Sequence, residues 1–339
     1  MTNIMITCVG GELMPQVIKS LKKIKGLPLT IIGTDNNINA LGKFFCDKFY
    51  KVPKGNKKNY ISKCEEIVKK EKINLIIPTS DEEALSLSKK KEYFSQFGTT
   101  IACVDFEKLK ILNDKSKTYT KLREFNIPTA EWEIIKNKEL LKEQIYLYFE
   151  KYGGVVIKPC LDRGSRNIFI ISRNKINKSS NSNINIFSNI NEFLPFIESK
   201  FLYTNYLVMQ ELSEPVVDVD LLSWKGKPLS VIPRKRIHPL LPNMGHKILN
   251  NERLIDLGKK IIKNFELSWL YDCDVMFDSN RKPIVIEINP RQSGSVAISI
   301  AAGFKIYEKL IKLYLNKKVY PEKKLHNKII IPYKSLHTI

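Results

Sequence analysis

The first 105 residues alternate short apolar runs with amphipathic segments, and this alternation restricts the fold more than any other feature of the chain. The apolar runs read as strands, and segments with apolar residues at helical spacing lie between them. Strands joined by helices in this way form a parallel sheet with helices on both faces. We expect strands at 3–9, 29–35, 74–83 and 99–105, and helices at 15–24 and 61–72.

The turn Gly10–Gly11 follows the first predicted strand and resembles a truncated dinucleotide-binding loop. A full G-x-G-x-x-G pattern lets the backbone approach a pyrophosphate, and the chain lacks that pattern here. We therefore interpret these glycines as turn chemistry and not as a cofactor site.

The sequence changes in character near Asn113. Asp114 is a favourable N-cap for a helix through KSKTYTKLREF (115–125), and the Asn126–Pro128 breaker should end that helix. The expected domains are 1–113 for the parallel βαβ part, 114–320 with a mobile lid at about 130–208, and 321–339 as a C-terminal tail.

The second half of the chain mixes predicted strands and helices. By its composition, the Asn- and Ser-rich segment 174–191 reads as an extended surface loop or insertion. Around it we expect strands at 206–212, 216–224, 271–278 and 285–291, and helices at 252–265 and from Ala297 onward.

Composition argues against several classes of protein. No apolar run approaches the length of about 18 residues that spans a bilayer, and the N-terminus MTNIMITCVGGE lacks the features of a signal peptide. We therefore expect a cytoplasmic protein that does not engage a membrane.

Of the four histidines, His238 and His246 are the only two close together, which is weak support for a metal site. The six cysteines form no C-x-x-C pair and are expected to be buried, reduced thiols: Cys8, Cys46, Cys64, Cys103, Cys160 and Cys273.

The formal charge of +21 would suit a nucleic-acid partner, because clustered Lys and Arg bind phosphates. The lysines, however, occur as KK and KKK along the whole chain, which is typical of solvated helix faces. No basic stretch is interleaved with aromatic residues of the kind that stack on bases. Nucleic acid is therefore not the partner that we favour.

The stretch VIEINPR (285–291) combines an apolar strand with polar residues two positions apart. Side chains alternate between the faces of a strand, so Glu287 and Asn289 share one face. Asp274 lies on the preceding strand across the turn DSNRKP (278–283), and a hairpin would bring its carboxylate to Glu287. The three side chains form an oxygen-only cluster that suits Mg²⁺, with Mn²⁺ as a further option. The alternative is a buried acidic pair that Arg or Lys neutralises.

A strand that ends in Lys158–Pro159 leads to a Gly164–Ser165 turn and a second strand. A lysine fixed at a strand end can reach the α- and β-phosphates of a nucleotide, and backbone N–H groups of the turn can cradle the terminal phosphates. The alternative is an ordinary β-hairpin with a solvated lysine.

The stretch Met209-Gln-Glu-Leu212 ends a buried strand and can present backbone groups to an adenine edge, with Glu211 accepting from the exocyclic amine. Seven residues later, Asp218 can accept both ribose hydroxyls. For either carboxylate the alternative is surface exposure.

Arg291 directly follows VIEINP, and Arg234 and Arg236 lie upstream at a predicted strand edge. Planar guanidinium groups bind carboxylates or phosphates bidentately, so these residues indicate a pocket for an acidic substrate. We take Arg291 and Arg236 as candidate catalytic residues. The alternative is that the arginines lie on the surface.

The motifs follow one order along the chain: Asp114–Lys115, the IKP strand end, the Gly–Ser loop, QEL with an aspartate seven residues on, DVMF and VIEINPR. With its motifs in this order, the chain resembles the ATP-grasp superfamily. The resemblance is closest to its carbamoyl-phosphate-synthase-like members, covers roughly 114–315 and is most specific at EINPR. It implies an α/β protein, α+β in the grasp part, with an N-terminal parallel βαβ domain followed by a two-lobed ATP-grasp fold.

The resemblance also implies roles for individual residues. Lys115 and Lys158 would contact nucleotide phosphates, and Arg291 would stabilise the reacting phosphorylated intermediate. The other implied roles are a flexible loop over ATP at Arg163, Gly164 and Ser165, further ATP contacts at Gln210, Glu211, Leu212 and Asp218, and Mg²⁺ ligands at Asp274, Glu287 and Asn289.

The implied activity is that of an ATP-dependent carboxylate–amine ligase, which forms an amide through an acyl phosphate and releases ADP and phosphate. Its partners would be ATP, Mg²⁺ and small-molecule carboxylate and amine substrates, and a homodimer would be in keeping with the superfamily. The loop LDRGSRNIF (161–169) is poorer in glycine than that of biotin carboxylases, which argues against carboxylase or carbamoyl-phosphate chemistry. The alternatives are a phosphotransferase that stops at the phosphorylated product, a catalytically silent nucleotide-binding protein and a basic nucleic-acid-binding protein.

Overall fold

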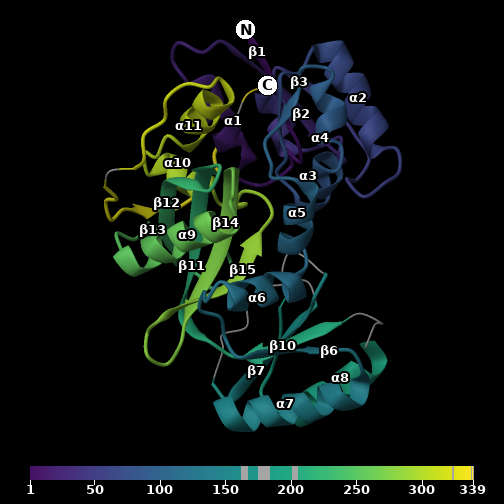
Figure 1. Ribbon diagram of the computed structural model, residues 1–339, viewed down its shortest axis with the longest axis vertical. Helices are drawn as coiled ribbons and strands as arrows, with labels where there is room; N and C mark the ends of the chain where they lie inside the picture. Colours follow the sequence, from purple (N-terminus) through teal and green to yellow (C-terminus); the bar gives the residue numbers. More distant parts are fainter. Residues whose placement is uncertain (162–166, 175–183, 201–204, 323, 337, 339) are drawn as a thin grey trace.

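The computed structural model describes residues 1–161, 167–174, 184–200, 205–322, 324–336 and 338. Within these residues the strands form three sheets, two of five strands and one of six. In Figure 1 the N-terminal sheet lies at the upper end of the molecule, and the lobe that follows residue 130 lies at the lower end. Among all the described residues, no helix combines the length and the apolar character needed to cross a membrane.

The N-terminal sheet contains β1 (Thr2–Ile6), β2 (Leu29–Asp35), β3 (Lys48–Lys51), β4 (Leu75–Ile77) and β5 (Thr100–Ile101). Its order is β3-β2-β1-β4-β5, and every pair is parallel, which confirms the predicted βαβ part. The pattern missed β3, because its sequence KFYK has no apolar run. The helices of this part are α1 (Met14–Lys22), α2 (Tyr60–Glu71), α3 (Asp81–Ser88), α4 (Lys91–Ser95), α5 (Phe106–Leu112) and the 3₁₀ helix η1 (Leu41–Phe45).

The Gly10–Gly11 turn after β1 is closed by Asp35 at the end of β2. The Gly10 N–H donates to Asp35 Oδ2 at 2.7 Å, and a Cβ on Gly10 would stand 2.8 Å from that oxygen. Because the N–H bonds to a protein carboxylate, it is not offered to a phosphate. The contact agrees with our interpretation of these glycines as turn chemistry.

The second sheet contains β6 (Trp132–Ile135), β7 (Gly154–Pro159), β8 (Ile168–Ser172), β9 (Ile184–Phe187) and β10 (Tyr206–Gln210) in the order β6-β10-β7-β8-β9. Helices α7 (Lys138–Tyr152) and α8 (Ile190–Lys200) lie along this sheet (Figure 1) and form a separate apolar core with it. The prediction that 174–191 is an extended surface loop is wrong in part. Isoleucines at alternate positions of INIF (184–187) let β9 pair in parallel with β8, and residues 175–183 lie outside the described residues.

The third sheet contains β11 (Ser213–Trp224), β12 (Lys227–Arg236), β13 (His246–Ile248), β14 (Trp269–Phe277), β15 (Pro283–Asn289) and β16 (Ile329–Ile330). It is antiparallel, in the order β15-β14-β11-β12-β13-β16. Helix α9 (Glu252–Asn264) packs on its apolar face, which leaves the other face for polar side chains. The single closing helix predicted from Ala297 is instead two, α10 (Ala297–Ala301) and α11 (Ile306–Tyr314), because Gly303 adopts a φ of +104° between them.

Helix α6 (Lys115–Glu124) leads from the N-terminal part into the second sheet. Asp114 caps it as predicted, since its Oδ1 accepts from the Ser116 N–H at 3.0 Å and from the Lys117 N–H at 3.4 Å. The domain boundaries stay predictions. Strand β16 nevertheless pairs with β13, so part of the segment 321–339 joins the third sheet.

The contact between α9 and the third sheet gives a stability prediction. A Cβ on Gly258 would lie 2.5 Å from Val231 Cγ1 and 3.0 Å from Leu221 Cδ2. We expect Gly258→Ala to lower the free energy of unfolding by about 1–3 kcal/mol, because overpacking outweighs the better helix propensity of alanine. Urea unfolding measures the effect, with Lys260→Ala on the exposed side of α9 as the control. A Gly258→Ala protein as stable as the wild type would contradict this packing.

Candidate active site

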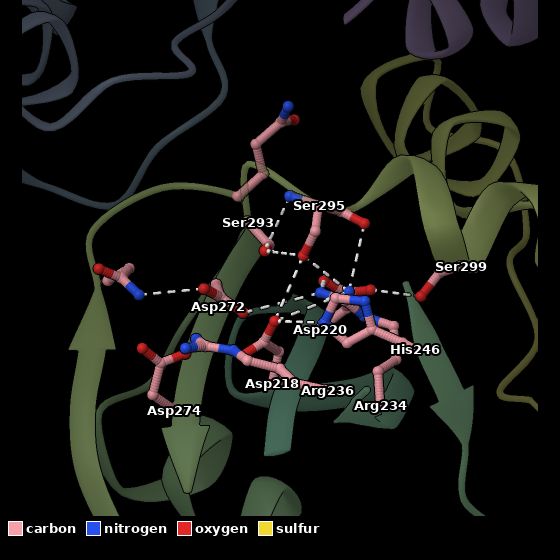
Figure 2. Close-up of polar contacts among 12 residues, drawn as sticks. Asp218, Asp220, Arg234, Arg236, His246, Asp272, Asp274, Ser293, Ser295 and Ser299 are labelled. Atoms are coloured by element: carbon pink, nitrogen blue, oxygen red, sulfur yellow. Dashed lines mark hydrogen bonds and ion pairs between the residues drawn. The ribbon is translucent and has the colours of Figure 1, made fainter. Parts of the chain in front are cut away.

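The polar face of the third sheet brings together the predicted residues Asp218, Arg236 and Asp274 (Figure 2). Asp218 of β11 lies opposite Asp274 of β14, and Asp220 lies opposite Asp272. On the other side of β14, Glu287 of β15 also lies opposite Asp274. The face is completed by Arg234, Arg236, His246 and Asn289. Acidic and basic side chains therefore form one largely buried layer.

Arg234 is at the centre of this layer and has no exposed surface. Its Nη2 donates to Asp220 Oδ1 at 2.9 Å, and its Nη1 donates to the Ser295 hydroxyl at 2.8 Å and the Ser295 carbonyl at 3.2 Å. Asp220 also accepts from the Ser299 hydroxyl. A guanidinium enclosed in this way ties the sheet to the segment after β15. The predicted place of Arg234 in a substrate pocket is therefore wrong.

Arg236 and Asp218 form an ion pair beside Arg234. Arg236 Nε donates to Asp218 Oδ1 at 2.6 Å, and Asp218 Oδ2 lies 2.8 Å from His246 Nε2. Burial raises the pKa of Asp218, but Arg236 and His246 outweigh burial and hold the pKa well below its usual range. Burial lowers the pKa of His246, so we take this imidazole as neutral, with Nε2 as the donor to Asp218.

Asp218, the predicted ribose ligand, is enclosed by its protein partners. Its side chain is 1% exposed, and both carboxylate oxygens are engaged by Arg236 and His246. The predicted ribose contact stays a prediction, and it would require a nucleotide to break a buried ion pair to reach this carboxylate.

Arg236 is held by protein groups at each of its three nitrogens. Besides Asp218, its Nη2 lies 3.2 Å from Asp274 Oδ1, and its Nη1 donates to the Pro239 carbonyl at 3.2 Å. A grip on a substrate carboxylate would require these bonds to be exchanged. In this arrangement Arg236 instead neutralises Asp274.

Asp274 and Glu287, the predicted carboxylate pair of a Mg²⁺ site, face each other across β14 and β15. Burial raises the pKa of Asp274 to about 7, with Asp218 and Glu287 acting in the same direction and Arg236 against them. Burial also opposes ionisation of Glu287, but Lys115, whose Nζ lies 3.0 Å from Oε1, and Lys158 lower its pKa. The pair is thus brought together as predicted, and each carboxylate has a basic neighbour.

Asn289 lies opposite Asp272, and its Nδ2 donates to Asp272 Oδ2 at 3.0 Å. This bond uses the amide nitrogen and leaves the amide oxygen for a ligand. Burial raises the pKa of Asp272 well above its usual range, as do the charges of Asp274 and Asp218. Over the described ranges, no three His, Cys, Asp or Glu side chains meet as a metal site. The predicted set of two carboxylates and one amide stays a prediction.

Lys158 ends β7, and only 5% of it is exposed. Its Nζ donates to the Ile286 carbonyl at 2.9 Å and to the Tyr119 hydroxyl at 3.4 Å. Ile286 is the extra residue of a β-bulge, because Glu287 pairs with Asp274 while Val285 pairs with Val275. Burial lowers the pKa of Lys158 to about 8. The alternative of a solvated hairpin lysine is therefore excluded.

Glu211 follows β10 and packs over β7. Its Oε2 accepts from the Ser172 hydroxyl at 2.7 Å, and a Cβ on Gly154 would collide with the same oxygen. Burial raises the pKa of Glu211. These contacts place Gln210, Glu211 and Leu212 at a strand end, and their contact with adenine stays a prediction. The predicted loop residues Arg163, Gly164 and Ser165 lie outside the described residues.

Arg291 connects the third sheet with the N-terminal part. Its Nε lies 3.0 Å from Asp81 Oδ1 at the start of α3, and its Nη1 donates to the Gln292 carbonyl at 2.8 Å. Its side chain is 20% exposed, against 15% for Arg236 and 0% for Arg234. Of the three predicted arginines, Arg291 is the one best placed to meet a substrate.

Several residues of the site escaped the sequence interpretation. Asp220 and Asp272 had a signal, since each stands two positions from a predicted residue in DVD or DCD and so shares its face. Tyr119 also had a signal, since it stands four residues after Lys115 on a predicted helix, whereas Asp81 had none because it comes from a distant segment. The residues missed are Asp81, Tyr119, Asp220, Asp272, Ser295 and Ser299.

Comparison with family models gives two matches. A model described as "ATP-grasp in the biosynthetic pathway with Ter operon" matches residues 203–334. A second, described as "PylC-like, N-terminal domain", matches residues 4–102. No curated protein sequence matches the chain. The two models fall on the grasp part and on the parallel sheet, which confirms the predicted order of folds.

Solved structures match nearly the whole chain at low identity. N5-carboxyaminoimidazole synthetase from Staphylococcus aureus, complexed with ADP, has a TM-score of 0.68 at 13% identity, covering 97% of this chain and 80% of that one. Biotin carboxylase from Campylobacter jejuni has a TM-score of 0.69 at 15% identity, covering 95% and 72%. L-amino acid ligase from Bacillus licheniformis has a TM-score of 0.65 at 11% identity, covering 93% and 74%. At these identities the likeness establishes a common fold.

Proposed function

We propose that the chain is an ATP-dependent carboxylate–amine ligase of the ATP-grasp superfamily that forms amide bonds, and the ATP-grasp model that matches residues 203–334 supports this. The observation that carries the proposal is the facing pair of carboxylates Asp274 and Glu287, of which Glu287 has Lys115 Nζ at 3.0 Å and a pKa that, despite burial, the charges of Lys115, Lys158 and Arg291 lower. The similar structures support it, since they include a synthetase with bound ADP and an amino acid ligase.

The donor set of this cluster suits Mg²⁺. Asp274, Glu287 and Asn289 offer oxygen ligands, which this ion prefers. Asp274 Oδ1 is buried and has an ion pair with Arg236 but no hydrogen bond among the described residues. These three side chains would hold the ion, which when bound neutralises charge on the nucleotide phosphates.

The proposed reaction has two steps. A substrate carboxylate oxygen attacks the γ-phosphorus of ATP, and ADP leaves with the electron pair of the bond to the β–γ bridging oxygen. An amine then attacks the acyl carbon, phosphate leaves with the electron pair of the C–O bond, and the nitrogen loses a proton. Phosphoryl transfer depends mainly on positioning and charge neutralisation. Basic side chains at a buried site supply both.

The lysines and the arginine have different roles in this proposal. Lys115 and Lys158 bind the nucleotide phosphates from α6 and β7. Arg291 pairs with the carboxylate and then with the acyl phosphate, because its planar guanidinium matches both groups. Asp81 holds Arg291 at Nε and so orients its remaining donors.

Calorimetric titration with Mg²⁺-ATP, followed by an ADP-release screen, tests the proposal. We expect micromolar binding, and ADP release that requires one carboxylate and one amine from pools of amino acids, peptides and sugar-linked acids. Mass spectrometry should show an amide whose mass is the sum of the two substrates less water. A phosphorylated product without amine would indicate a phosphotransferase, and binding without turnover would indicate a silent nucleotide-binding protein. Absence of binding in folded protein would contradict the proposal.

A further inference from the structure

Tyr119 lies next to Lys158, one of the two lysines proposed to bind the nucleotide phosphates, and has no exposed surface. It stands four residues after Lys115 on α6, so the two side chains share one face of that helix. Lys115 bonds to Glu287, and the Tyr119 hydroxyl donates to the adjoining Ile286 carbonyl at 2.9 Å. One helix face therefore contacts two consecutive residues of β15.

The Ile286 carbonyl accepts from two side chains at once. Lys158 Nζ approaches it at 2.9 Å, the same distance as the Tyr119 hydroxyl, and the two donors are 3.4 Å apart. A lysine ammonium has three N–H donors. Among the described residues, two of these donors are directed to Ile286 and Tyr119, which leaves one for a ligand oxygen.

The ring of Tyr119 completes the enclosure of Lys158. Lys158 Nζ lies 5.2 Å from the ring centroid, within the range of a cation–π contact. The ring itself is fixed by an edge contact with Trp132, at 5.6 Å between centroids. Because a lysine side chain otherwise has several free rotamers, this fixation removes entropy before a nucleotide binds.

We propose that Tyr119 is the positioning residue of Lys158: its hydroxyl, together with the bulged Ile286 carbonyl, directs the remaining ammonium donor at the nucleotide phosphates. This inference rests on the proposed nucleotide site. It assigns the tyrosine a part in phosphate binding and none in contact with the base or the sugar.

The substitution Tyr119→Phe tests the inference, because it removes the hydroxyl and keeps the ring against Trp132. We expect the calorimetric Kd for Mg²⁺-ATP to rise about 3- to 10-fold, as the loss of one hydrogen bond predicts. The Kd for adenosine, which has no phosphate, should stay unchanged. A purely structural role of the hydroxyl would move both constants together.

Tyr271→Phe is the matched control. Tyr271 is also a buried tyrosine with a hydroxyl bond to the backbone, since it accepts from the Val104 N–H at 2.7 Å. It stands beside Asp272 in sequence and so points to the opposite, apolar face of β14. Loss of the Tyr271 hydroxyl should leave the Kd for Mg²⁺-ATP unchanged.

A double-mutant cycle with Lys158→Ala locates the effect. In the Lys158→Ala background, Tyr119→Phe should weaken the binding of Mg²⁺-ATP no further, because the ammonium group that the hydroxyl positions is already absent. An unchanged Kd in Tyr119→Phe, an equal effect on adenosine, or an effect that persists in the Lys158→Ala background would each overturn the inference. If the folded wild type binds no Mg²⁺-ATP, the proposed function fails and the inference with it. If the wild type binds and only the tyrosine predictions fail, the proposed function stands.

Discussion

The Glu287→Gln variant is expected to release ADP about a thousandfold more slowly than the wild type, which corresponds to about 4 kcal/mol of transition-state stabilisation. Glutamine keeps the size of the side chain but removes the charge that faces Asp274 and pairs with Lys115 at 3.0 Å. On the proposed assignment, the site then loses both a charged Mg²⁺ ligand and the partner of a lysine that binds the nucleotide phosphates. A coupled ADP assay, with the substrates that support turnover in the wild type, measures the effect.

An exposed carboxylate provides the control for this variant. Glu66 pairs with Lys63 on the surface of α2, so Glu66→Gln should leave the rate unchanged. Circular dichroism and thermal unfolding would verify that Glu287→Gln is folded. A folded Glu287→Gln protein with wild-type ADP release would exclude Glu287 as a metal ligand.

The largest expected loss of stability comes from Arg234→Met. The arginine is fully buried and donates to Asp220 at 2.9 Å, and it lies 3.9 Å from Asp218 and 4.0 Å from Asp272. Methionine would leave these buried carboxylates without their common counter-charge, at a cost of about 3–5 kcal/mol. Since the whole free energy of unfolding is typically about 5–15 kcal/mol, urea unfolding should show a much lower midpoint.

A second arginine and a paired substitution test this prediction. Arg253 is exposed on α9, so Arg253→Met should change the free energy of unfolding by less than about 0.5 kcal/mol. Adding Asp220→Leu to Arg234→Met should recover part of the lost stability, because it removes one uncompensated charge and fills the space with apolar atoms. An Arg234→Met protein as stable as the wild type would contradict the central position of this ion-pair layer.

Local patterns were sufficient for the elements that carry the site. The period of two along VIEINPR predicted that Glu287 and Asn289 share a face, and the hairpin predicted that Asp274 meets Glu287. The cap at Asp114 predicted the start of α6. These predictions hold because each depends on residues close together in the chain.

Local patterns did not identify the partners that come from distant segments. Asp218 was expected to face a ribose, yet it forms an ion pair with Arg236 of β12 and a hydrogen bond with His246 of β13. Arg234 was expected near a substrate, yet it bonds to Ser295 beyond β15. Alternation predicts which face a side chain occupies, but the register between strands determines which charges it meets there.

The sequence by itself thus determined the βαβ alternation of the N-terminal part and the polar face on which Asp274, Glu287 and Asn289 lie, since periodicity and capping are local properties. Tertiary structure decided the environment of each charge. The bulge at Ile286 supplies the carbonyl that holds Lys158, and α3 of the N-terminal part brings Asp81 to Arg291. The reason is physical: burial and counter-charges set the state of an ionisable group, and both depend on the packing of segments that are far apart in the chain.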